Sequence, residues 1–323
     1  MKVFAKDHLA KFQSLLALAV LVIVLSFASD RFLTSENILN VLRQISVNLT
    51  VSIGMTMIIL TGGIDLSIGS VVALSGAVAA GLLKNGISLP YWNVTLQFTV
   101  FGAIVAGIAV GLVAGWCNGF VITRFRVPPF VATLGMLSIA RGLTQLWTHN
   151  YPITNLGKQF TFMGLGYLWG IPMPVWISAA LVPVFVLVTR RTRFGRHLYA
   201  VGGNERAARL SGVNVNRVKL LAYMFGAALA GVAGLLTAAR SNAADPKVGV
   251  GYELDSIAAV VIGGTSLAGG RGSILGTVLG CLIIGVLNNG LGLVGVSSEW
   301  QLVVKGVVII VAVAIDQAGR RAE

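Results

Sequence analysis

The sequence predicts an all-α polytopic membrane protein with about ten transmembrane helices, discontinuous Gly-Gly broken helices and an internal repeat. The first observation is composition: of 323 residues, 56% are hydrophobic and only 11% are charged, with a mean hydropathy of +0.86. Ordinary globular domains carry about 25% charged residues. The other two observations are the lengths of the apolar segments and the distribution of basic residues between them.

The apolar segments are long enough to cross a bilayer, because a hydrocarbon core of about 30 Å needs about 20 helical residues. The first segment follows three lysines and resembles a secretory signal, but we interpret it as an uncleaved span because several spans follow it. We expect one transmembrane domain over residues 1–323, with spans near 13–29, 38–60, 66–83, 94–123, 128–148, 174–189, 220–240, 252–266, 274–293 and 300–317.

The basic residues predict the orientation of these spans. With both termini in the cytoplasm, sixteen Lys and Arg residues fall on the cytoplasmic side and five on the outer side, which is the bias that membrane insertion favours. The net charge of +13 therefore reflects topology. We expect no nucleic-acid partner, because the basic residues lie in the intervals between apolar spans.

The interval 190–219 is the longest polar stretch between spans and holds eight of the 24 Lys and Arg residues. Such a basic interval stays in the cytoplasm. Within it, Gly202, Gly203 and Asn204 predict a turn and a helix N-cap, and Gly212 predicts the end of that short helix. The interval serves either orientation alone or the docking of a soluble partner.

Two glycine-centred segments resemble each other at an offset of 201 residues. Segments 59–70 and 260–270 share the pattern apolar-Gly-Gly-x-x-Leu-small-x-Gly. Duplicated interruptions of this kind mark discontinuous helices in internally repeated transporters. The apolar run 257–262 is too short to span a bilayer alone, so we expect a half-helix or re-entrant element there.

Polar residues inside or beside spans are candidates for function. Asp65 follows the first break, where it either lines a path or caps the next helix. Asn288 and Asn289 either line a polar path or bond between helices. Arg141 lies well inside its span and must face protein or water, or extend its charge toward the membrane surface.

The sequence contains no arrangement of residues that indicates catalysis. His8, His149 and His197 lie in predicted loops without a paired carboxylate or cysteine, which general acid–base or nucleophilic chemistry would need. The phosphate-binding pattern G-x-x-x-x-G-K-[ST] does not occur. Any nucleotide chemistry must therefore come from another subunit.

Four motifs resemble those of a known family: GGIDLSIGS at 62–70, GGNERAARLSGVNVNRVK at 202–219, GYELDSIAAVVIGGTSLAGGRG at 251–272 and LNNGLGLVGVSS at 287–298. Together they resemble the ribose-type permeases of ATP-binding-cassette importers, over about residues 15–317. The resemblance implies a bacterial inner-membrane, multi-pass permease in contact with lipid. It also implies a second permease copy or a sister permease, a cytoplasmic ATPase with two cassettes, and a periplasmic sugar-binding protein. ATP and Mg would bind to the ATPase, and this chain would bind no cofactor.

The resemblance also suggests roles for individual residues. The predicted short helix becomes the element that couples to the ATPase, through Asn204, Glu205, Arg206, Ala207, Ala208, Arg209, Leu210, Ser211 and Gly212, with the two arginines three residues apart on one face. Candidates for a transient sugar path are Asn48, Thr61, Asp65, Ser67, Thr265, Ser266 and Asn288. The outer loops 149–173 and 241–256 would meet the binding protein, with acidic partners for its basic residues at Asp245, Glu253 and Asp255.

An ion-coupled secondary sugar transporter is the alternative from another class. Its coupling ion would need carboxylates at mid-membrane, and only Asp65 lies near such a position. A channel fits the sequence less well. Within the family, permeases for other monosaccharides or for autoinducer-2 have similar motifs, because the binding protein performs most of the selection.

Overall fold

The structure is a computed structural model that describes residues 2–89, 91 and 93–321. Met1 and residues 322–323 of the predicted domain lie outside the described residues. So do the side chains of the amino-terminal lysines and of Arg320 and Arg321, which contributed to the orientation prediction. The described chain is helical except for its connections and three two-stranded sheets.

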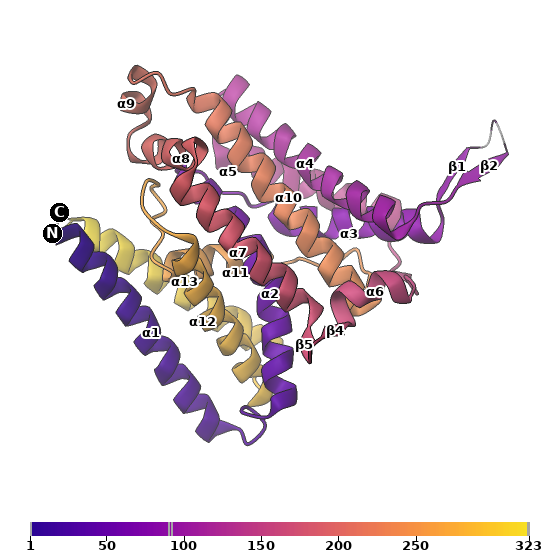
Figure 1. Ribbon diagram of the computed structural model, residues 1–323, viewed down its shortest axis with the longest axis horizontal. Helices are drawn as coiled ribbons and strands as arrows, with labels where there is room; N and C mark the ends of the chain where they lie inside the picture. The colour runs from indigo at the N-terminus through magenta and orange to yellow at the C-terminus, as the bar shows by residue number, and fades with distance from the viewer. Residues whose placement is uncertain (1, 90, 92, 322–323) are drawn as a thin grey trace. The chain divides into compact units, whose positions relative to one another are not determined.

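The helices and strands follow one another as a series of long helices with short elements between them (Figure 1). The first half contains α1 (Lys2–Ala28), α2 (Ser35–Leu60), α3 (Ile68–Lys84), β1 (Ile87–Leu89), β2 (Val94–Leu96), α4 (Val100–Arg124), α5 (Pro129–Thr148), β3 (Ile153–Thr154), α6 (Lys158–Leu165), β4 (Tyr167–Leu168) and β5 (Ile171–Pro172). The second half contains α7 (Met173–Arg191), α8 (Arg193–Gly203), α9 (Glu205–Leu210), α10 (Val215–Ser241), β6 (Ala243–Ala244), α11 (Tyr252–Ile262), α12 (Ile274–Leu293) and α13 (Ser298–Arg321).

Five of the described helices, α2, α4, α7, α10 and α12, are long and apolar enough to cross a membrane. The part of α1 from Ser14 to Ala28 and the whole of α3 are shorter apolar helices. The chain is therefore an all-α polytopic membrane protein. A helix lies in each of the ten predicted span ranges, while the number of membrane crossings and the single-domain organisation remain predictions.

Two predicted span boundaries are wrong. The span near 94–123 begins too early, because β2 pairs antiparallel with β1 and α4 begins only at Val100, after the Thr99 hydroxyl caps the Gly102 N–H. The span near 252–266 ends too late, because α11 stops at Ile262. With 11 residues, α11 is about 16 Å long, roughly half of a bilayer core. The half-helix predicted there is confirmed.

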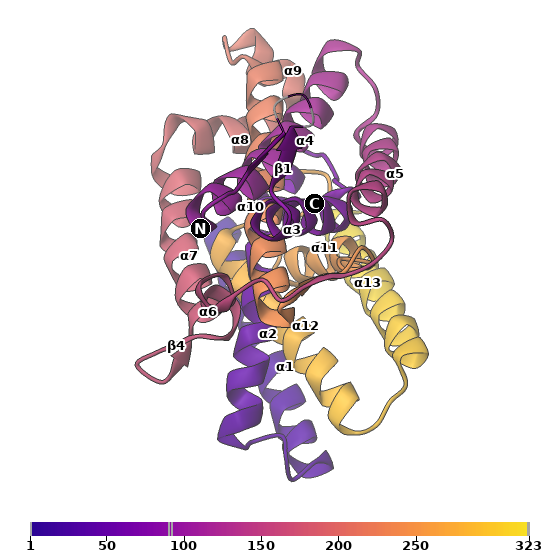
Figure 2. The ribbon, with the colours of Figure 1, turned by 90° about the vertical axis from the view of Figure 1, so that its right-hand side faces the viewer.

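The chain forms two compact units, each assembled from separate stretches of sequence. Unit 1 comprises Met1–Gly63, Ala179–Val213 and Leu254–Glu323, and unit 2 comprises Ile64–Ser178 and Asn214–Glu253. In unit 1, α12 packs against α1 and α2 (Figure 1). In unit 2, α10 packs against α3 and α4, and α3 also packs against α5 (Figure 2).

Small residues allow the helices of unit 2 to pack backbone against backbone. A Cβ atom added at Gly111 of α4 would meet the Ala227 carbonyl of α10, and one at Gly234 of α10 would meet the Val72 carbonyl of α3. Close approach of this kind favours helix association in lipid, where the hydrophobic effect gives little help. The glycines of these helices therefore serve packing.

Candidate functional site

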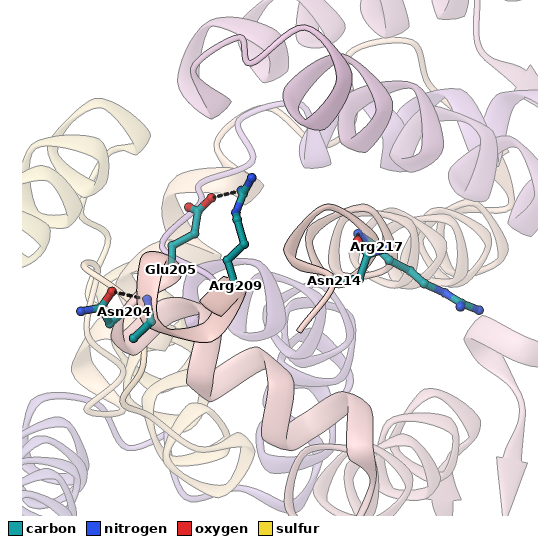
Figure 3. Close-up of polar contacts among 6 residues, drawn as sticks. Asn204, Glu205, Arg209, Asn214 and Arg217 are labelled. Carbon is teal, nitrogen blue, oxygen red and sulfur yellow. Dashed lines mark hydrogen bonds and ion pairs between the residues drawn. The ribbon is translucent and has the colours of Figure 1, made fainter. Parts of the chain in front are cut away.

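The polar interval 190–219 contains the short helix that the sequence predicted. The Asn204 side-chain Oδ1 accepts a hydrogen bond from the Ala207 backbone N–H at 3.0 Å and so caps α9 (Figure 3). At the other end, Gly212 has a φ of +84°, and the Val213 N–H bonds back to the Ala208 carbonyl at 3.0 Å. The predicted N-cap and the predicted helix stop are both confirmed.

Helix α9 presents most of its surface to the outside. Of its six described residues, Ala208 alone is buried, and the apolar side chain of Leu210 is 90% exposed. Arg206 is also exposed. An exposed leucine and arginine on one short helix are candidate contacts for a partner surface, since arginine is enriched in protein interfaces.

Arg209 already has a partner within this helix, while its predicted contact with the ATPase, like that of Arg206, stays a prediction. Its guanidinium forms an ion pair with Glu205 at 3.0 Å, and the two side chains are 57% and 43% exposed (Figure 3). An exposed pair with this spacing contributes at most about 0.5 kcal/mol to helix stability. Figure 3 also shows that Asn214 caps α10 in the same manner as Asn204 caps α9, by accepting from the Arg217 N–H at 3.0 Å.

Helix α8, which the sequence analysis did not predict, leads into α9. Thr192 caps its first turn through a hydrogen bond from the Gly195 N–H at 3.1 Å. The helix buries Gly195, Leu198 and Val201, which recur every three residues. That spacing and the threonine cap were the local signals for a helix. They were overlooked because one of the buried positions is a glycine within a strongly basic stretch.

Helix α8, within the polar interval 190–219, contacts the interrupted helices of unit 1. A Cβ atom added at Gly202 would collide with the Leu60 carbonyl oxygen and the Gly270 amide nitrogen. The Gly270 N–H also donates to the Leu60 carbonyl at 3.0 Å. The end of α2, the end of α8 and the segment after α11 therefore meet at one place. We call this contact of Leu60, Gly202 and Gly270 the glycine junction.

Tyr199 provides a second link between α8 and the segment after α11. Its hydroxyl donates to the Gly272 carbonyl at 3.0 Å. Burial raises the pKa of the Tyr199 hydroxyl above its usual value, and Arg190 acts in the opposite direction. The phenol therefore remains a neutral hydrogen-bond donor at physiological pH.

The two glycine breaks end their helices with the same pair of backbone hydrogen bonds. After α2, the Gly62 N–H bonds to the Ile59 carbonyl and the Gly63 N–H to the Ile58 carbonyl. After α11, the N–H groups of Gly264 and Thr265 bond to the carbonyls of Val261 and Val260. Gly62 and Gly264 each have a positive φ, of +77° and +84°, as this C-terminal motif requires. The hydrogen bonds therefore place equivalent residues of the two breaks 202 positions apart, whereas the sequence pattern aligned the breaks at 201 positions.

Asp65, in unit 2, forms a hydrogen-bonded turn just ahead of α3. Its Oδ1 accepts from the Ser67 backbone N–H at 2.8 Å and from the Ser67 hydroxyl. Asn118 donates its side-chain N–H to the same hydroxyl at 3.0 Å. Asp65 is fully buried, and its Oδ2 has no hydrogen-bond partner in the described chain. Asp65 therefore stabilises the turn that leads into α3, but it does not cap the helix itself, because Ser67 is the N-cap residue of α3 and the helix has no side-chain cap hydrogen bond among the described residues.

Five of the seven candidates for a sugar path are at most 5% exposed: Thr61, Asp65, Ser67, Thr265 and Ser266. The Thr61 hydroxyl bonds back to the Ile58 carbonyl at 2.7 Å, while the Thr265 hydroxyl has no partner in the described chain. Asn48 and Asn288 are partly exposed. The role of all seven in a path remains a prediction.

Asn289 bonds between helices, as the sequence analysis considered for this amide pair. It exchanges two hydrogen bonds with Asn37 of α2, at 2.9 and 3.0 Å. Asn288 instead donates to the Asp255 carboxylate at 3.4 Å. The two neighbouring amides therefore serve different partners.

The two predicted outer loops meet in unit 2. Strand β3 of the first loop pairs antiparallel with β6 of the second, and the Asn242 side-chain Oδ1 accepts from the Leu156 N–H at 2.9 Å. Arg141 holds the second loop by donating to the carbonyls of Pro246 and Val248, at 2.5 and 2.8 Å. Arg141 therefore faces protein, one of the options that its position in a span left open.

The three predicted docking acids have different environments. Asp245 accepts from the Lys247 backbone N–H at 2.8 Å, and Glu253 accepts from the Gly251 N–H at 3.2 Å. Both are partly exposed. Asp255 forms an ion pair with Lys305 of α13 at 3.0 Å, with the Asp255 side chain 14% exposed. Asp255 is thus engaged within unit 1, and its predicted docking role stays a prediction.

Comparison with known proteins identifies the family. The model of the family described as branched-chain amino acid transport system / permease component matches residues 37–313. The chain is 45% identical over 317 residues to the ribose import permease protein of Escherichia coli (strain K12), a match that covers 97% of this chain and 95% of that protein. It is 47% identical over 305 residues to the ribose import permease protein of Bacillus subtilis (strain 168), covering 94% and 91%.

A more distant relative is the xylose transport system permease protein of Haemophilus influenzae, 35% identical over 369 residues, with 95% of this chain and 96% of that protein covered. No solved structure matches this chain. The family model covers most of the chain, including both glycine breaks and the polar interval 190–219. The chain therefore belongs to the family of branched-chain amino acid transport system permease components.

Proposed function

We propose that this chain is the transmembrane permease subunit of an ATP-binding-cassette importer for a monosaccharide, with ribose as the first candidate. Identity of 45–47% over nearly the whole chain to two proteins named as ribose import permeases supports ribose as the cargo. Relatives named for xylose and D-allose transport are 35% and 37% identical, which supports the wider class of monosaccharides.

A separate cytoplasmic ATPase with two cassettes supplies the energy. The observation that carries this proposal is the exposed helix α9, whose neighbour α8 contacts the ends of two interrupted helices at the glycine junction. A permease without nucleotide-binding residues needs such a contact to receive work from a partner. ATP and Mg belong to that partner.

Closure of the cassettes moves α9 and α8 together. Because Gly202 has no side chain that can yield, a displacement of α8 passes directly to Leu60 and Gly270. The ends of α2 and of the segment after α11 then shift, and the path changes from outward-facing to inward-facing. A sugar carries no charge, so the path needs only transient polar contacts, while a periplasmic binding protein provides the affinity.

The proposal also includes the membrane topology and the other partners of the importer. Both termini lie in the cytoplasm, and the chain sits in a bacterial inner membrane next to a second permease copy or a sister permease. The paired outer loops receive the binding protein. Asp245 and Glu253, which are partly exposed, are the acids proposed to meet its basic residues, so changing both to lysine should weaken docking in a salt-sensitive manner. An affinity that does not depend on salt would contradict this role.

The coupling role is tested with the Arg206→Glu/Leu210→Asp double variant of α9, in the full importer reconstituted with its ATPase and binding protein. We expect binding-protein-stimulated ATP hydrolysis and sugar uptake to fall together by about tenfold or more, as for the loss of a central interface contact. Arg217→Glu, combined with Asn216→Asp, is the matched control, because together they make the same total charge change at exposed positions of α10.

Uptake that persists in the α9 double variant would contradict the coupling role. Uptake that falls equally in the Asn216→Asp/Arg217→Glu control would assign the effect to the loss of basic charge from the interval, rather than to contact through α9. Membrane insertion of all three proteins, measured by their yield in the detergent-soluble monodisperse fraction, ensures that the comparison concerns coupling.

A further inference from the structure

Unit 1 contains a charged cluster that the coupling mechanism does not use. Asp255 of α11, Asn288 of α12 and Lys305 of α13 meet around one carboxylate oxygen: Asp255 Oδ2 accepts from Lys305 Nζ at 3.0 Å and from the Asn288 Nδ2 at 3.4 Å. We call these three residues the polar cluster. The Lys305 and Asp255 side chains are 21% and 14% exposed, so the cluster is largely but not completely enclosed.

The hydrogen-bonding capacity of the polar cluster is only partly used. The Asn288 Oδ1 is a buried acceptor with no partner in the described chain. Lys305 has three N–H donors and makes one hydrogen bond within the described part of the chain. Both bonds to Asp255 reach the same carboxylate oxygen, Oδ2. The cluster thus offers an amide acceptor, ammonium donors and a second carboxylate oxygen to a further molecule.

A buried acceptor without a partner is costly in a membrane protein. The neighbouring amide shows the usual solution, because Asn289 and Asn37 satisfy each other with two hydrogen bonds in the same unit. Asn288 differs from Asn289 although the two are adjacent on α12. The free acceptor of Asn288 therefore points to a group that the chain itself does not supply.

The chemistry of the polar cluster favours a neutral solute with several hydroxyl groups. One negative and one positive charge cancel, so the cluster gives no net attraction for an ion. Each hydroxyl group can donate to Asp255 or Asn288 and accept from Lys305, and hydrogen bonds to charged groups are the stronger ones. Adjacent hydroxyls of a sugar ring match such a mixed set of donors and acceptors.

The position of the cluster fits the entrance of the proposed path. Asp255 is three residues from the start of α11 and Lys305 seven from the start of α13, so they lie about 5 Å and 10 Å along their helices. Asn288 lies five residues before the end of α12, or about 8 Å. The proposed orientation of the chain places these three helix ends on the outer side of the membrane.

We propose that Asp255, Asn288 and Lys305 form a binding station for sugar hydroxyl groups at the outer end of the translocation path. This inference rests on the proposed function and specifies where the permease first contacts its cargo. The Asp255–Lys305 ion pair holds α11 and α13 together, and Asn288 provides the acceptor that cargo occupies. Asn288 can therefore be changed without removal of the ion pair.

The test measures sugar uptake and ATP hydrolysis in proteoliposomes that contain the full importer, saturated with ribose-loaded binding protein. The variant is Asn288→Leu, which keeps four side-chain heavy atoms branched at Cγ and has no polar atoms, with Asn288→Ser as a smaller replacement. We expect ribose transported per ATP hydrolysed to fall about two- to tenfold, as for the loss of one or two hydrogen bonds. Thermal stability and stimulated ATP hydrolysis should remain near those of the parent.

Asn289→Leu is the matched control, one residue along the same helix. It leaves Asn37 without its partner, so it should lower thermal stability while the ratio of ribose to ATP stays unchanged. An unchanged ratio in both Asn288 variants would overturn the binding station. So would a loss of stability and ATP hydrolysis in both, because Asn288 would then be a structural residue.

Failure of the proposed function would look different from failure of the binding station. If the parent importer hydrolysed ATP and accumulated no monosaccharide, the function would be wrong regardless of Asn288. If the parent accumulated ribose and the variants did so equally well, only the binding station would be wrong.

Discussion

After α2 and after α11 the chain ends a helix with the same two backbone hydrogen bonds, yet the residues that follow are held in different ways. In unit 2, side chains hold the chain after the first break: Asp65 accepts from the Ser67 N–H, and Asn118 donates to the Ser67 hydroxyl. In unit 1, backbone contacts hold the segment after α11, in which Gly270 meets Leu60 and Gly202, and the Tyr199 hydroxyl adds one side-chain link to Gly272.

Under the proposed function, this difference separates a fixed anchor at Asp65 from a contact at Gly202 that transmits motion. A buried side-chain network tolerates an isosteric replacement that keeps its hydrogen bonds, whereas two backbones in contact at glycine tolerate no added side chain. Gly202 also lies within the polar interval 190–219, next to α9. The duplicated sequence thus supports two different tasks, and each task can be tested by substitution.

The largest effect is expected for Gly202→Ala. Its methyl group would collide with Leu60 and Gly270, and overpacking of this kind costs about 1–3 kcal/mol or more. We expect stimulated ATP hydrolysis and sugar uptake to fall by about tenfold, since 1.4 kcal/mol corresponds to a factor of ten. Both are measured in the reconstituted importer.

Gly203→Ala is the control for Gly202→Ala. A Cβ atom at Gly203 meets no other atom within 4 Å, and alanine is the better helix former by about 1 kcal/mol. Activity should therefore be retained in this variant. Equal losses at the two neighbouring glycines would show that flexibility of α8, and not contact at the junction, is what transport requires.

The next largest effect concerns Asp65. Asp65→Ala removes the acceptor of the Ser67 N–H and should destabilise the protein by about 1–3 kcal/mol, the cost of leaving a buried donor unsatisfied. Asp65→Asn keeps an acceptor oxygen, so transport should persist. Thermal unfolding in detergent and uptake in proteoliposomes measure the two effects. Loss of uptake in stable Asp65→Asn protein would instead favour the ion-coupled transporter, which needs a charge at this position.

A smaller effect is expected for Tyr199→Phe. This change removes the hydrogen bond to the Gly272 carbonyl and keeps the ring, so it should cost about 0.5–1.5 kcal/mol. We expect a partial reduction, of about two- to tenfold, in the sugar uptake that accompanies each round of ATP hydrolysis. No change in uptake would indicate that α8 acts on the second break through Gly202 alone.

The smallest effect is expected for Arg209→Gln. The exposed ion pair with Glu205 contributes at most about 0.5 kcal/mol, so thermal stability should stay within about 0.5 kcal/mol of the parent protein. Titration of the ATPase subunit with the variant permease then shows whether Arg209 also contacts the partner. A large loss of stability would contradict the view that this pair is merely a surface contact of α9.

The cap and the end of α9, in the polar interval 190–219, could be predicted from the sequence because neighbouring residues determine them. Asn204 caps the helix that begins beside it, and Gly212 adopts the left-handed conformation that ends it. The half-helix α11 followed from the length of an apolar run. Each of these features depends on residues within a few positions of one another.

The features that the sequence analysis missed depend on contacts between distant residues or on weak signals. Asp255 is paired with a lysine 50 residues away, a partner that its acidic character alone did not reveal. The contact of Gly202 with Leu60 joins residues more than 140 positions apart. Strand β2 was included in a span because Val94 and Leu96 are apolar, although the strand pairs with β1 rather than continuing into α4.

The central claim is that work from a separate ATPase reaches the membrane helices through α9 and the glycine junction. The most direct measurement compares sugar accumulation by the purified permease in liposomes with accumulation by the permease reconstituted with its ATPase, binding protein and ATP. We predict accumulation against a gradient only in the complete system. Concentration of sugar by the permease alone, without nucleotide or partner proteins, would contradict the claim.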